Sequence, residues 1–365
     1  MRNLLRSLWD VWPPLTTLAI VACWSVGCAD SRKTSVRHEE RVHTFDRFDD
    51  VFTSGSPITL EEGPGVLTVS PLASLDSTRG GFFVTDIKEH QVRAYDERGA
   101  LRMYVGGTGM GDTTFQAPPM FAFRQHDDSV LTCDFRAMCS IVGTDGTLKR
   151  QFAVTELETV YGGVPINGTS KILIAGRGKA GDQLLHLWNA TTGRVEQSFF
   201  KIPVRPDLEM TARFAGHVSV AVHAGRVAAV FALEPTVYVF DMVGNLERQI
   251  PIESKGFRPI QKPAPLETGD RETISAWANT LSRVSDVFWL SPDRLVVQYY
   301  DLVGLRLRWG VVGMTVTGQH LFEIMPSTKL MAVDPRTGAL WFVAPPGESL
   351  NHWLPAHLIP NVAAR

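Results

Sequence analysis

The sequence repeats one short unit along most of its length, and this repetition limits the possible folds more than any other feature. The clearest copy, GGFFVTDIKEHQVRAYDERGALRMYVG from Gly80 to Gly106, alternates apolar, β-branched runs with turn residues, which predicts three strands. Similar units begin at Ser129, Lys171, Arg226 and Arg294, and KLMAVDPRTGALWFVAPP is a partial sixth. Corresponding strands begin at Phe82, Val130, Ile172, Val227, Leu295 and Leu340, in steps of 48, 42, 55, 68 and 45 residues.

Six units with a period of roughly 45 to 50 residues predict an all-β fold, a six-bladed β-propeller of four-stranded antiparallel blades. Each blade is apolar on both faces and buries them only between two neighbours, so a closed ring also protects the ends of the array. Seven blades are the alternative if one unit is misassigned. The sixth unit has too few strands after Ala344, and we expect a segment of about Val42 to Leu60 to complete that blade.

The segment GGTGMGDTTFQAPP, residues 106–119, carries three alternating glycines and therefore raises the question of a phosphate-binding loop. Such a loop needs a helix N-terminus behind its glycines, and Pro118-Pro119 would stop a helix there. The segment instead lies between strands expected over 101–105 and 120–123. We therefore interpret it as the connector between two blades, with Phe115 packed between them.

The first unit resembles the NHL-type, TolB-like repeat of six-bladed propellers. The residues that carry the resemblance are Phe83, Val84, Thr85, Asp86, Val92, Tyr95, Asp96, Gly99 and the segment 106–118. The resemblance covers roughly residues 60–345 and implies the fold, but propellers of this kind serve as receptors, scaffolds and enzymes alike. It therefore leaves the biochemical activity open.

The N-terminus has the pattern of a secretory signal, with Arg2 and Arg6 followed by an apolar run that is short for a membrane span. Residues 1–27 resemble a bacterial lipoprotein signal peptide, which implies a lipid-modified cysteine at the start of the mature chain. Cys28 is the expected lipidation site and Cys23 is the alternative. An uncleaved membrane anchor is a further possibility. Residues 28–41 are polar and predict a flexible tether, and residues 42–365 form the propeller domain.

Cys133 and Cys139 remain after such processing. In an exported protein an isolated pair of this kind favours a disulfide, provided that the strands around residues 134–138 form a hairpin. The alternative is two reduced, half-buried thiols.

An insertion over 253–286 accounts for the longest step between units. Its second half predicts a helix over 271–284 with Asp270 as N-cap, because apolar residues recur there at helical spacing. The helix would either cover a mouth of the propeller channel or cover the edges of blades. The candidate ligand-binding residues are Phe257, Arg258, Trp277, Tyr299 and His217.

The sequence contains few features that indicate a catalytic site. Asp86 and Asp134 follow equivalent strands and are expected to shape turns by accepting backbone N–H groups. Propeller enzymes such as the amidating lyases hold a metal through channel histidines, but His217 and His223 would lie about 20 Å apart along one strand. We therefore assign no catalytic residue, metal ligand or cofactor.

The formal net charge of −2 does not favour nucleic acid as a partner. The sequence as a whole favours an exported monomer, lipid-anchored to a bacterial membrane. The expected membrane is the outer one, with the protein facing the periplasm or the cell exterior. There it would act as a binding or scaffold module for an envelope protein, a peptide or a glycan. The alternative is a propeller-class enzyme, either a metal-assisted lyase or a lactonase-like hydrolase.

Overall fold

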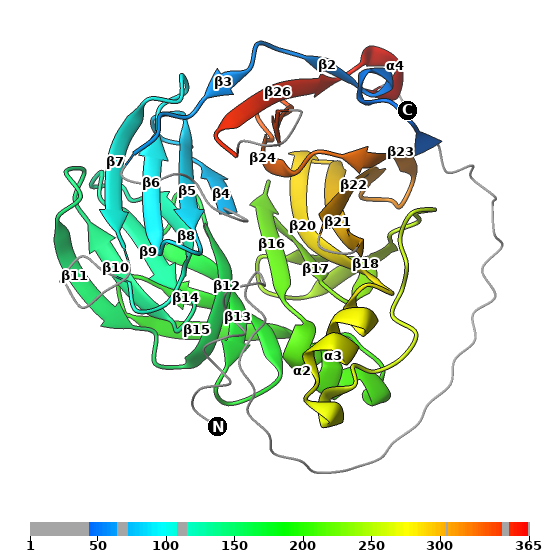
Figure 1. The fold of residues 1–365 in the computed structure, drawn as a ribbon. Coiled ribbons are helices and arrows are strands. Elements are labelled where there is room, and N and C mark those ends of the chain that lie inside the picture. Colours follow the sequence, from blue (N-terminus) through cyan, green and yellow to red (C-terminus); the bar gives the residue numbers. More distant parts are fainter. Residues whose placement is uncertain (1–43, 64–71, 108–114, 304–305, 345–349, 364–365) are drawn as a thin grey trace.

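The computed structural model describes residues 44–63, 72–107, 115–303, 306–344 and 350–363. These residues form six antiparallel sheets around a central axis, so the protein is a six-bladed β-propeller (Figure 1). Five blades each contain four consecutive strands, and the sixth combines three consecutive strands with β2 (Phe52–Ser54) from the N-terminal segment. The first of the consecutive strands in each blade faces the centre of the ring. The predicted fold class and blade number are therefore confirmed.

The strands of the first three blades are β4 (Leu72–Leu75), β5 (Phe82–Asp86), β6 (Gln91–Tyr95) and β7 (Leu101–Gly106), then β8 (Pro119–Arg124), β9 (Val130–Asp134), β10 (Met138–Val142) and β11 (Leu148–Ala153), and then β12 (Leu157–Pro165), β13 (Lys171–Gly178), β14 (Gln183–Asn189) and β15 (Arg194–Lys201). The fourth and fifth blades contain β16 (Val218–His223), β17 (Arg226–Phe231), β18 (Glu234–Asp241) and β19 (Leu246–Pro251), and then β20 (Ser282–Ser291), β21 (Arg294–Val303), β22 (Arg306–Thr315) and β23 (His320–Ser327). The sixth contains β24 (Leu330–Asp334), β25 (Ala339–Val343), β26 (His352–Leu358) and β2 (Phe52–Ser54).

The N-terminal segment closes the ring, as the shortage of strands in the sixth unit predicts. β2 and β3 (Ile58–Thr59) both pair antiparallel with β26, so the sixth blade takes its outermost strand from the other end of the chain. β1 (Thr44–Phe45) adds to the fifth blade by pairing parallel with β23. The segment then reaches the first blade, where the Glu61 N–H donates to the Gly99 carbonyl at 2.8 Å. One stretch of chain thus joins three blades.

Apolar side chains fill the spaces between neighbouring blades. Phe83 and Val92 of the first blade pack with Ala122 and Val130 of the second, and Phe115 completes this cluster. Phe115 is 5% exposed, and β8 rather than a helix follows it, which confirms that the segment is a connector between blades. Its residues 108–114 lie outside the described part of the chain.

The two strand-end aspartates shape turns. Asp86 Oδ1 accepts the Lys88 and Glu89 N–H groups, both at 3.0 Å. Asp134 Oδ1 accepts the N–H groups of the residues two and four positions later, at 2.9 and 3.0 Å. Cys133 and Cys139 occupy facing positions of β9 and β10 and are joined by a disulfide, with Cα atoms 4.0 Å apart.

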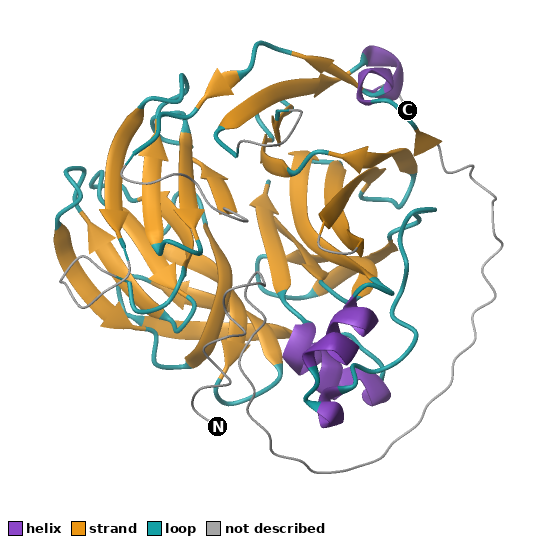
Figure 2. Ribbon diagram, viewed as in Figure 1, coloured by secondary structure: helices purple, strands orange, loops and turns teal. Residues whose placement is uncertain are grey.

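The helices of the insertion and α2 (Glu209–Ala215) gather on one side of the ring, beside the fourth blade, whereas α4 (Pro360–Ala363) lies near β2 at another edge (Figures 1 and 2). The insertion contains η3 (Leu266–Thr268) and α3 (Arg271–Ala278), and the Asp270 side chain caps α3 by accepting the Glu272 and Thr273 N–H groups. The predicted helix over 271–284 is too long. The chain leaves helical conformation after Asn279, and β20 begins at Ser282. Val284, Val287, Phe288 and Trp289 favour a strand there, because β-branched and aromatic residues fit a pleated, half-buried surface.

A further helix, α2 (Glu209–Ala215), follows η2 (Pro206–Leu208), and the sequence pattern does not predict it. α2 packs beside the insertion, where the Ala264 N–H donates to Thr211 Oγ1 at 2.8 Å. The remaining short helices are η1 (Phe48–Asp50) and α4 (Pro360–Ala363).

Among the described residues there is no helix of the length and apolar character that a bilayer span requires. The predicted signal peptide, the tether and the candidate lipidation sites Cys28 and Cys23 all lie outside the described residues.

Candidate functional site

The centre of the ring holds a cavity of about 700 Å³. All six inner strands, β4, β8, β12, β16, β20 and β24, contribute to its wall. Contacts between neighbouring inner strands join corresponding positions: Ser74 Oγ donates to the Ala122 carbonyl at 2.7 Å, and Trp289 Nε1 donates to the Ala221 carbonyl at 3.1 Å. The inner strands therefore run in the same direction, and the cavity has one mouth where they begin and another where they end.

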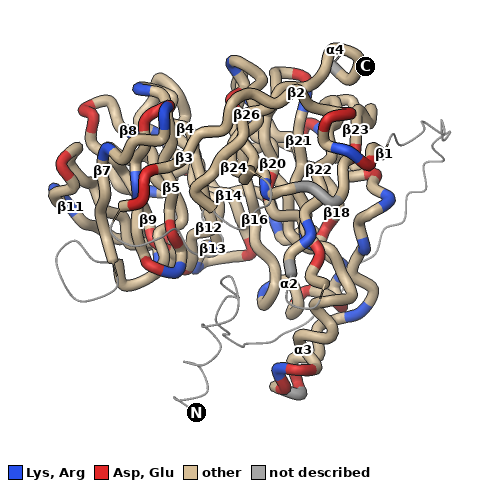
Figure 3. Tube along the Cα trace, turned by 45° about the horizontal axis from the view of Figure 1, so that its top comes forward, with Lys and Arg blue, Asp and Glu red and all other residues tan. Residues whose placement is uncertain are grey.

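We call the mouth where the inner strands begin the helix-side mouth, because the C-terminal end of α2 and the residues after it, Phe214 to His217, line it. α3 protrudes from the ring near α2 (Figure 3) but contributes no residue to the cavity wall. Trp277 of α3 instead packs with α2 and the fourth blade. The helix of the insertion therefore covers the edges of blades and does not cover a mouth of the channel.

Four ionisable side chains from three neighbouring blades line the helix-side mouth. His217 directly precedes β16, Arg283 and Asp286 lie on β20, and Lys329 directly precedes β24. Gln298 holds this region together: its Nε2 donates to Asp286 Oδ2 at 3.2 Å, and its Oε1 accepts the backbone N–H of the residue after Lys329 at 2.6 Å. Asp286 and the start of β24 are therefore tied to the same buried amide.

Burial sets the protonation behaviour of this group. Desolvation lowers the pKa of His217; the nearby Asp286 carboxylate opposes this shift and Arg283 reinforces it. Desolvation lowers the pKa of Lys329 to about 8, and Asp286 again opposes the shift. At neutral pH His217 is therefore a neutral imidazole, and Lys329 keeps most of its positive charge.

Two aromatic side chains near the end of the β21–β22 hairpin lie beside these charged side chains. The three strands β20 to β22 have ten residues each, against four to six in the first blade, so the β21–β22 hairpin is longer than its counterpart there. Tyr300 and Trp309 face each other across it with ring centroids 5.3 Å apart, and both line the cavity. The Lys329 amine lies 5.6 Å from the centre of the Trp309 ring.

The opposite mouth carries charges that are already paired. Arg124 Nη2 lies 2.7 Å from Asp76 Oδ2, and both side chains are almost fully buried. Arg336 Nε lies 3.0 Å from Asp334 Oδ1. Each of these pairs is neutral overall, so the net charge of the cavity wall comes from the helix-side mouth.

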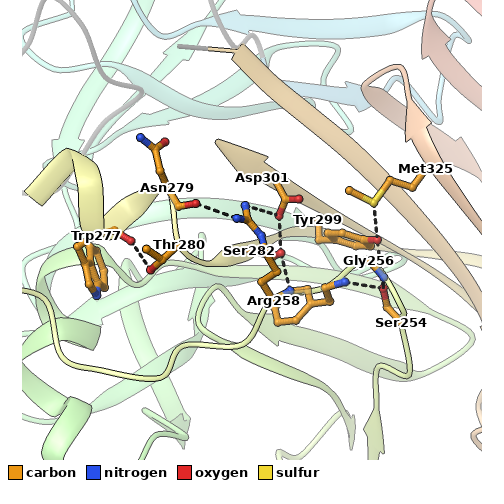
Figure 4. A network of polar contacts seen from close by, with 11 residues as sticks. Ser254, Gly256, Arg258, Trp277, Asn279, Thr280, Ser282, Tyr299, Asp301 and Met325 are labelled. Carbon is orange, nitrogen blue, oxygen red and sulfur yellow. Dashed lines mark hydrogen bonds and ion pairs between the residues drawn. The ribbon is translucent and has the colours of Figure 1, made fainter. Parts of the chain in front are cut away.

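The five predicted ligand-binding residues do not form one site. Phe257 and Tyr299 are in contact, with ring centroids 5.5 Å apart, but Tyr299 is fully buried. Arg258 Nη1 donates to the Asn279 carbonyl at 2.8 Å, and Figure 4 shows Arg258 beside Asp301 in a network that anchors the insertion to the fifth blade. These contacts hold the insertion in place.

Trp277 is 9% exposed, and its Nε1 donates to the Lys262 carbonyl at 3.0 Å, so this predicted ligand-binding residue is also part of the packing of the insertion. His217 is the one predicted residue that lines the cavity. Arg283, Asp286 and Lys329 also line the cavity, and the sequence does not predict them as site residues. Their position on or just before an inner strand is the signal that could identify them, but the repeat pattern does not mark the inner strands of the last two blades.

No group of three or more His, Cys, Asp or Glu side chains in the described ranges is arranged to hold a metal ion. His217 and His223 both line the cavity, and they lie at opposite ends of β16.

Comparisons with known proteins support the architecture. A member of the DUF4221 family from Bacteroides vulgatus matches with a TM-score of 0.57 at 9% identity, over 84% of this chain and 97% of that one. A candidate exported protein from Bacteroides fragilis matches with a TM-score of 0.54 at 9% identity, over 87% and 98%. This likeness establishes the fold alone. No protein-family model matches the sequence, and no curated protein sequence is similar to it.

Proposed function

We propose that the protein is a binding module of the bacterial cell envelope, tethered through its N-terminus, and that the central cavity is its ligand site. The observation that carries the proposal is the cavity of about 700 Å³ whose wall includes residues of every blade. Ligand pockets in proteins have volumes of about 300 to 1,000 Å³ and combine an apolar wall with a few polar groups, which describes this cavity.

Two features support the envelope location. The lipoprotein-like N-terminal sequence is of the kind that directs export, and the disulfide between Cys133 and Cys139 suits an oxidising compartment. The Bacteroides fragilis protein of similar fold, itself a candidate exported protein, agrees with this location. The tether is tested by cell fractionation and mass spectrometry of the N-terminal peptide. Cys28→Ser should release the protein from the membrane fraction, and Cys23→Ser should not.

The ligand site is tested by filling the cavity. Gly162 lies on β12 and lines the cavity, its backbone suits an L-residue, and a Cβ built there meets no atom within 4 Å. Gly162→Trp should therefore occupy the cavity without displacing its wall. Gly181, in an exposed bend outside the cavity, has equally open surroundings and a backbone that suits an L-residue, so Gly181→Trp is the matched control.

The assay is a thermal-shift screen of the full-length protein against cell-wall fragments, short peptides, sugars and small organic acids. The proposal expects at least one compound to stabilise the wild type and Gly181→Trp but not Gly162→Trp. Compounds that stabilise all three proteins equally would place binding elsewhere and would refute the cavity as the site. One divalent ion tightly held per chain, found by metal analysis, would instead favour the metal-assisted enzyme.

A further inference from the structure

We propose that the central cavity binds a neutral, flat, apolar molecule, held between aromatic walls of the second and fifth blades. This inference rests on the cavity being the ligand site and names the class of ligand that it takes. The ligand is defined by its chemistry, an aromatic ring system without a formal charge.

The first argument is that the charged side chains of the cavity wall already have partners within the protein. This holds for each Asp, Arg and Lys side chain that lines the described part of the wall. The contacts are Asp76 with Arg124, Asp334 with Arg336, Asp286 with Gln298, Lys329 with the Trp309 ring and Arg283 with the Trp277 ring. A charged ligand would compete with these contacts and would lose its own hydration, whereas a neutral ligand leaves them in place.

The second argument is the apolar surface that lies between the two mouths. The inner strands present half-buried apolar side chains to the cavity there, among them Val164, Val220, Val222 and Phe288. A ligand that covers these side chains removes their remaining apolar surface from water, which favours binding. The interior of the cavity therefore suits an apolar body.

The third argument is the distribution of aromatic side chains around the ring. Of the ten Phe, Tyr and Trp residues that line the cavity in the described part of the chain, three belong to the second blade and four to the fifth. They are Phe121, Phe123 and Phe135, and Phe288, Trp289, Tyr300 and Trp309. Neighbouring inner strands contact each other in sequence order around the ring, so the second and fifth blades lie opposite each other (Figure 1). A flat ring between them can contact aromatic side chains on both sides.

The fourth argument is the shape of the wall beside the second blade. A Cβ at Gly163 would lie 2.6 Å from the Phe121 ring, so this ring lies directly against the bare backbone of β12. The rings of Phe121 and Phe123 are parallel to within 7°, with centroids 5.7 Å apart. A Cβ at the adjacent Gly162 would meet no atom within 4 Å. The two glycines therefore leave open space beside flat surfaces, which favours a flat ring over a puckered one.

The test compares four compounds that share a two-ring skeleton. 2-Naphthol is flat and neutral, decahydro-2-naphthol is neutral and puckered, 2-naphthoate is a flat anion and 2-naphthylmethylamine is a flat cation. Binding to the full-length protein is measured by isothermal titration calorimetry and ligand-observed NMR at pH 7. We expect 2-naphthol to bind most tightly.

The two ions should bind at least about tenfold more weakly than 2-naphthol, because their charged groups lose hydration in the cavity without gaining a partner. Decahydro-2-naphthol has comparable apolar surface but cannot make aromatic contacts. It should bind roughly two- to tenfold more weakly than 2-naphthol for that reason.

Three variants and one control locate the binding. Gly162→Trp should abolish binding of 2-naphthol, and Gly181→Trp should not. Tyr300→Leu removes an aromatic ring from the wall of the fifth blade and should weaken 2-naphthol binding roughly two- to tenfold while leaving decahydro-2-naphthol binding nearly unchanged. Phe152→Leu, at a half-buried position of the second blade outside the cavity, is the matched control and should change neither. The melting temperature of each variant shows that it is folded.

Equal binding of neutral and charged naphthalenes, blocked by Gly162→Trp, would overturn the neutral ligand and leave the cavity as a binding site. Decahydro-2-naphthol that binds as tightly as 2-naphthol would overturn the aromatic walls as the basis of recognition. Binding of 2-naphthol that Gly162→Trp does not block would overturn the inference by placing the compound outside the cavity. Absence of any 2-naphthol binding would overturn the ligand class, while a hit of another class from the thermal-shift screen would still support the cavity.

Discussion

Phe52 is the side chain through which the N-terminal segment holds the ring closed. It lies on β2, is 2% exposed, and its ring centroid lies 5.5 Å from that of Phe322 in the fifth blade and 5.3 Å from that of Phe342 in the sixth. Phe48, just upstream, packs on the same ring at 4.8 Å. One side chain thus joins the closing strand to the two blades that it spans.

Phe52→Ala should therefore weaken ring closure strongly. Burying an aromatic side chain of this size removes roughly 150 to 250 Å² from water, which at about 25 cal/mol per Å² corresponds to about 4 to 6 kcal/mol as an upper bound. Measured Phe→Ala costs in protein cores are about 3 to 5 kcal/mol, and we expect the free energy of unfolding to fall by that amount. In a propeller domain of this size, 42–365, the melting temperature should fall by roughly 4 to 8 °C.

Thr53→Ala is the matched control, because Thr53 lies on the same strand with its side chain exposed and pairs with His357 through the backbone. It should cost no more than about 0.5 kcal/mol. Differential scanning calorimetry and urea unfolding of both variants give the comparison. Melting temperatures of Phe52→Ala and Thr53→Ala within about 2 °C of each other would refute the closing role of this side chain.

Three further predictions concern the blades themselves. Burial lowers the pKa of His186 to about 4, below its unfolded value of 6.5, so the free energy of unfolding should fall by up to about 3 kcal/mol as the pH falls from about 6.5 toward 4. In urea unfolding at a series of pH values, His186→Gln should reduce this pH dependence, and His357→Gln, at an exposed position, should not. Replacing both Cys133 and Cys139 with Ala should lower the free energy of unfolding by about 2 kcal/mol, the loop-entropy value for so short a loop; a stability gain would contradict the assigned role of the bond. Tyr299→Phe should cost about 1 to 3 kcal/mol, because it removes a buried hydroxyl that bonds Glu323 at 2.9 Å; unchanged urea unfolding would show that this network does not anchor the insertion.

The parts of the fold that the sequence predicts well depend on local patterns. Strand starts recur because each blade repeats the same turn chemistry, and the Asp86 and Asp134 turns form as that chemistry requires. Ring closure was predictable by counting, since the sixth unit has fewer strands than the others. The disulfide followed from a hairpin that places Cys133 opposite Cys139.

The predictions that fail depend on contacts between distant segments. Trp277 and Tyr299 look like ligand-binding aromatics in the sequence, but contacts with residues far along the chain bury them, as the Tyr299 bond to Glu323 shows. The helix over 271–284 was predicted from apolar spacing alone, which cannot show where an inner strand begins. Lys329 and Arg283 are 46 positions apart, and only the ring arrangement brings their strands together at one mouth.

The repeat and the candidate site are therefore complementary features of this sequence. Positions that recur from blade to blade are those that pack blades together, and they are apolar because every interface has the same geometry. A site that recognises an asymmetric ligand needs positions at which the side chains differ from blade to blade. The helix-side mouth meets this condition: blades four to six place His217, Arg283, Asp286 and Lys329 where the first three blades contribute mostly apolar groups. In a propeller, the side chains that interrupt the repeat near the channel are consequently the first to test for function.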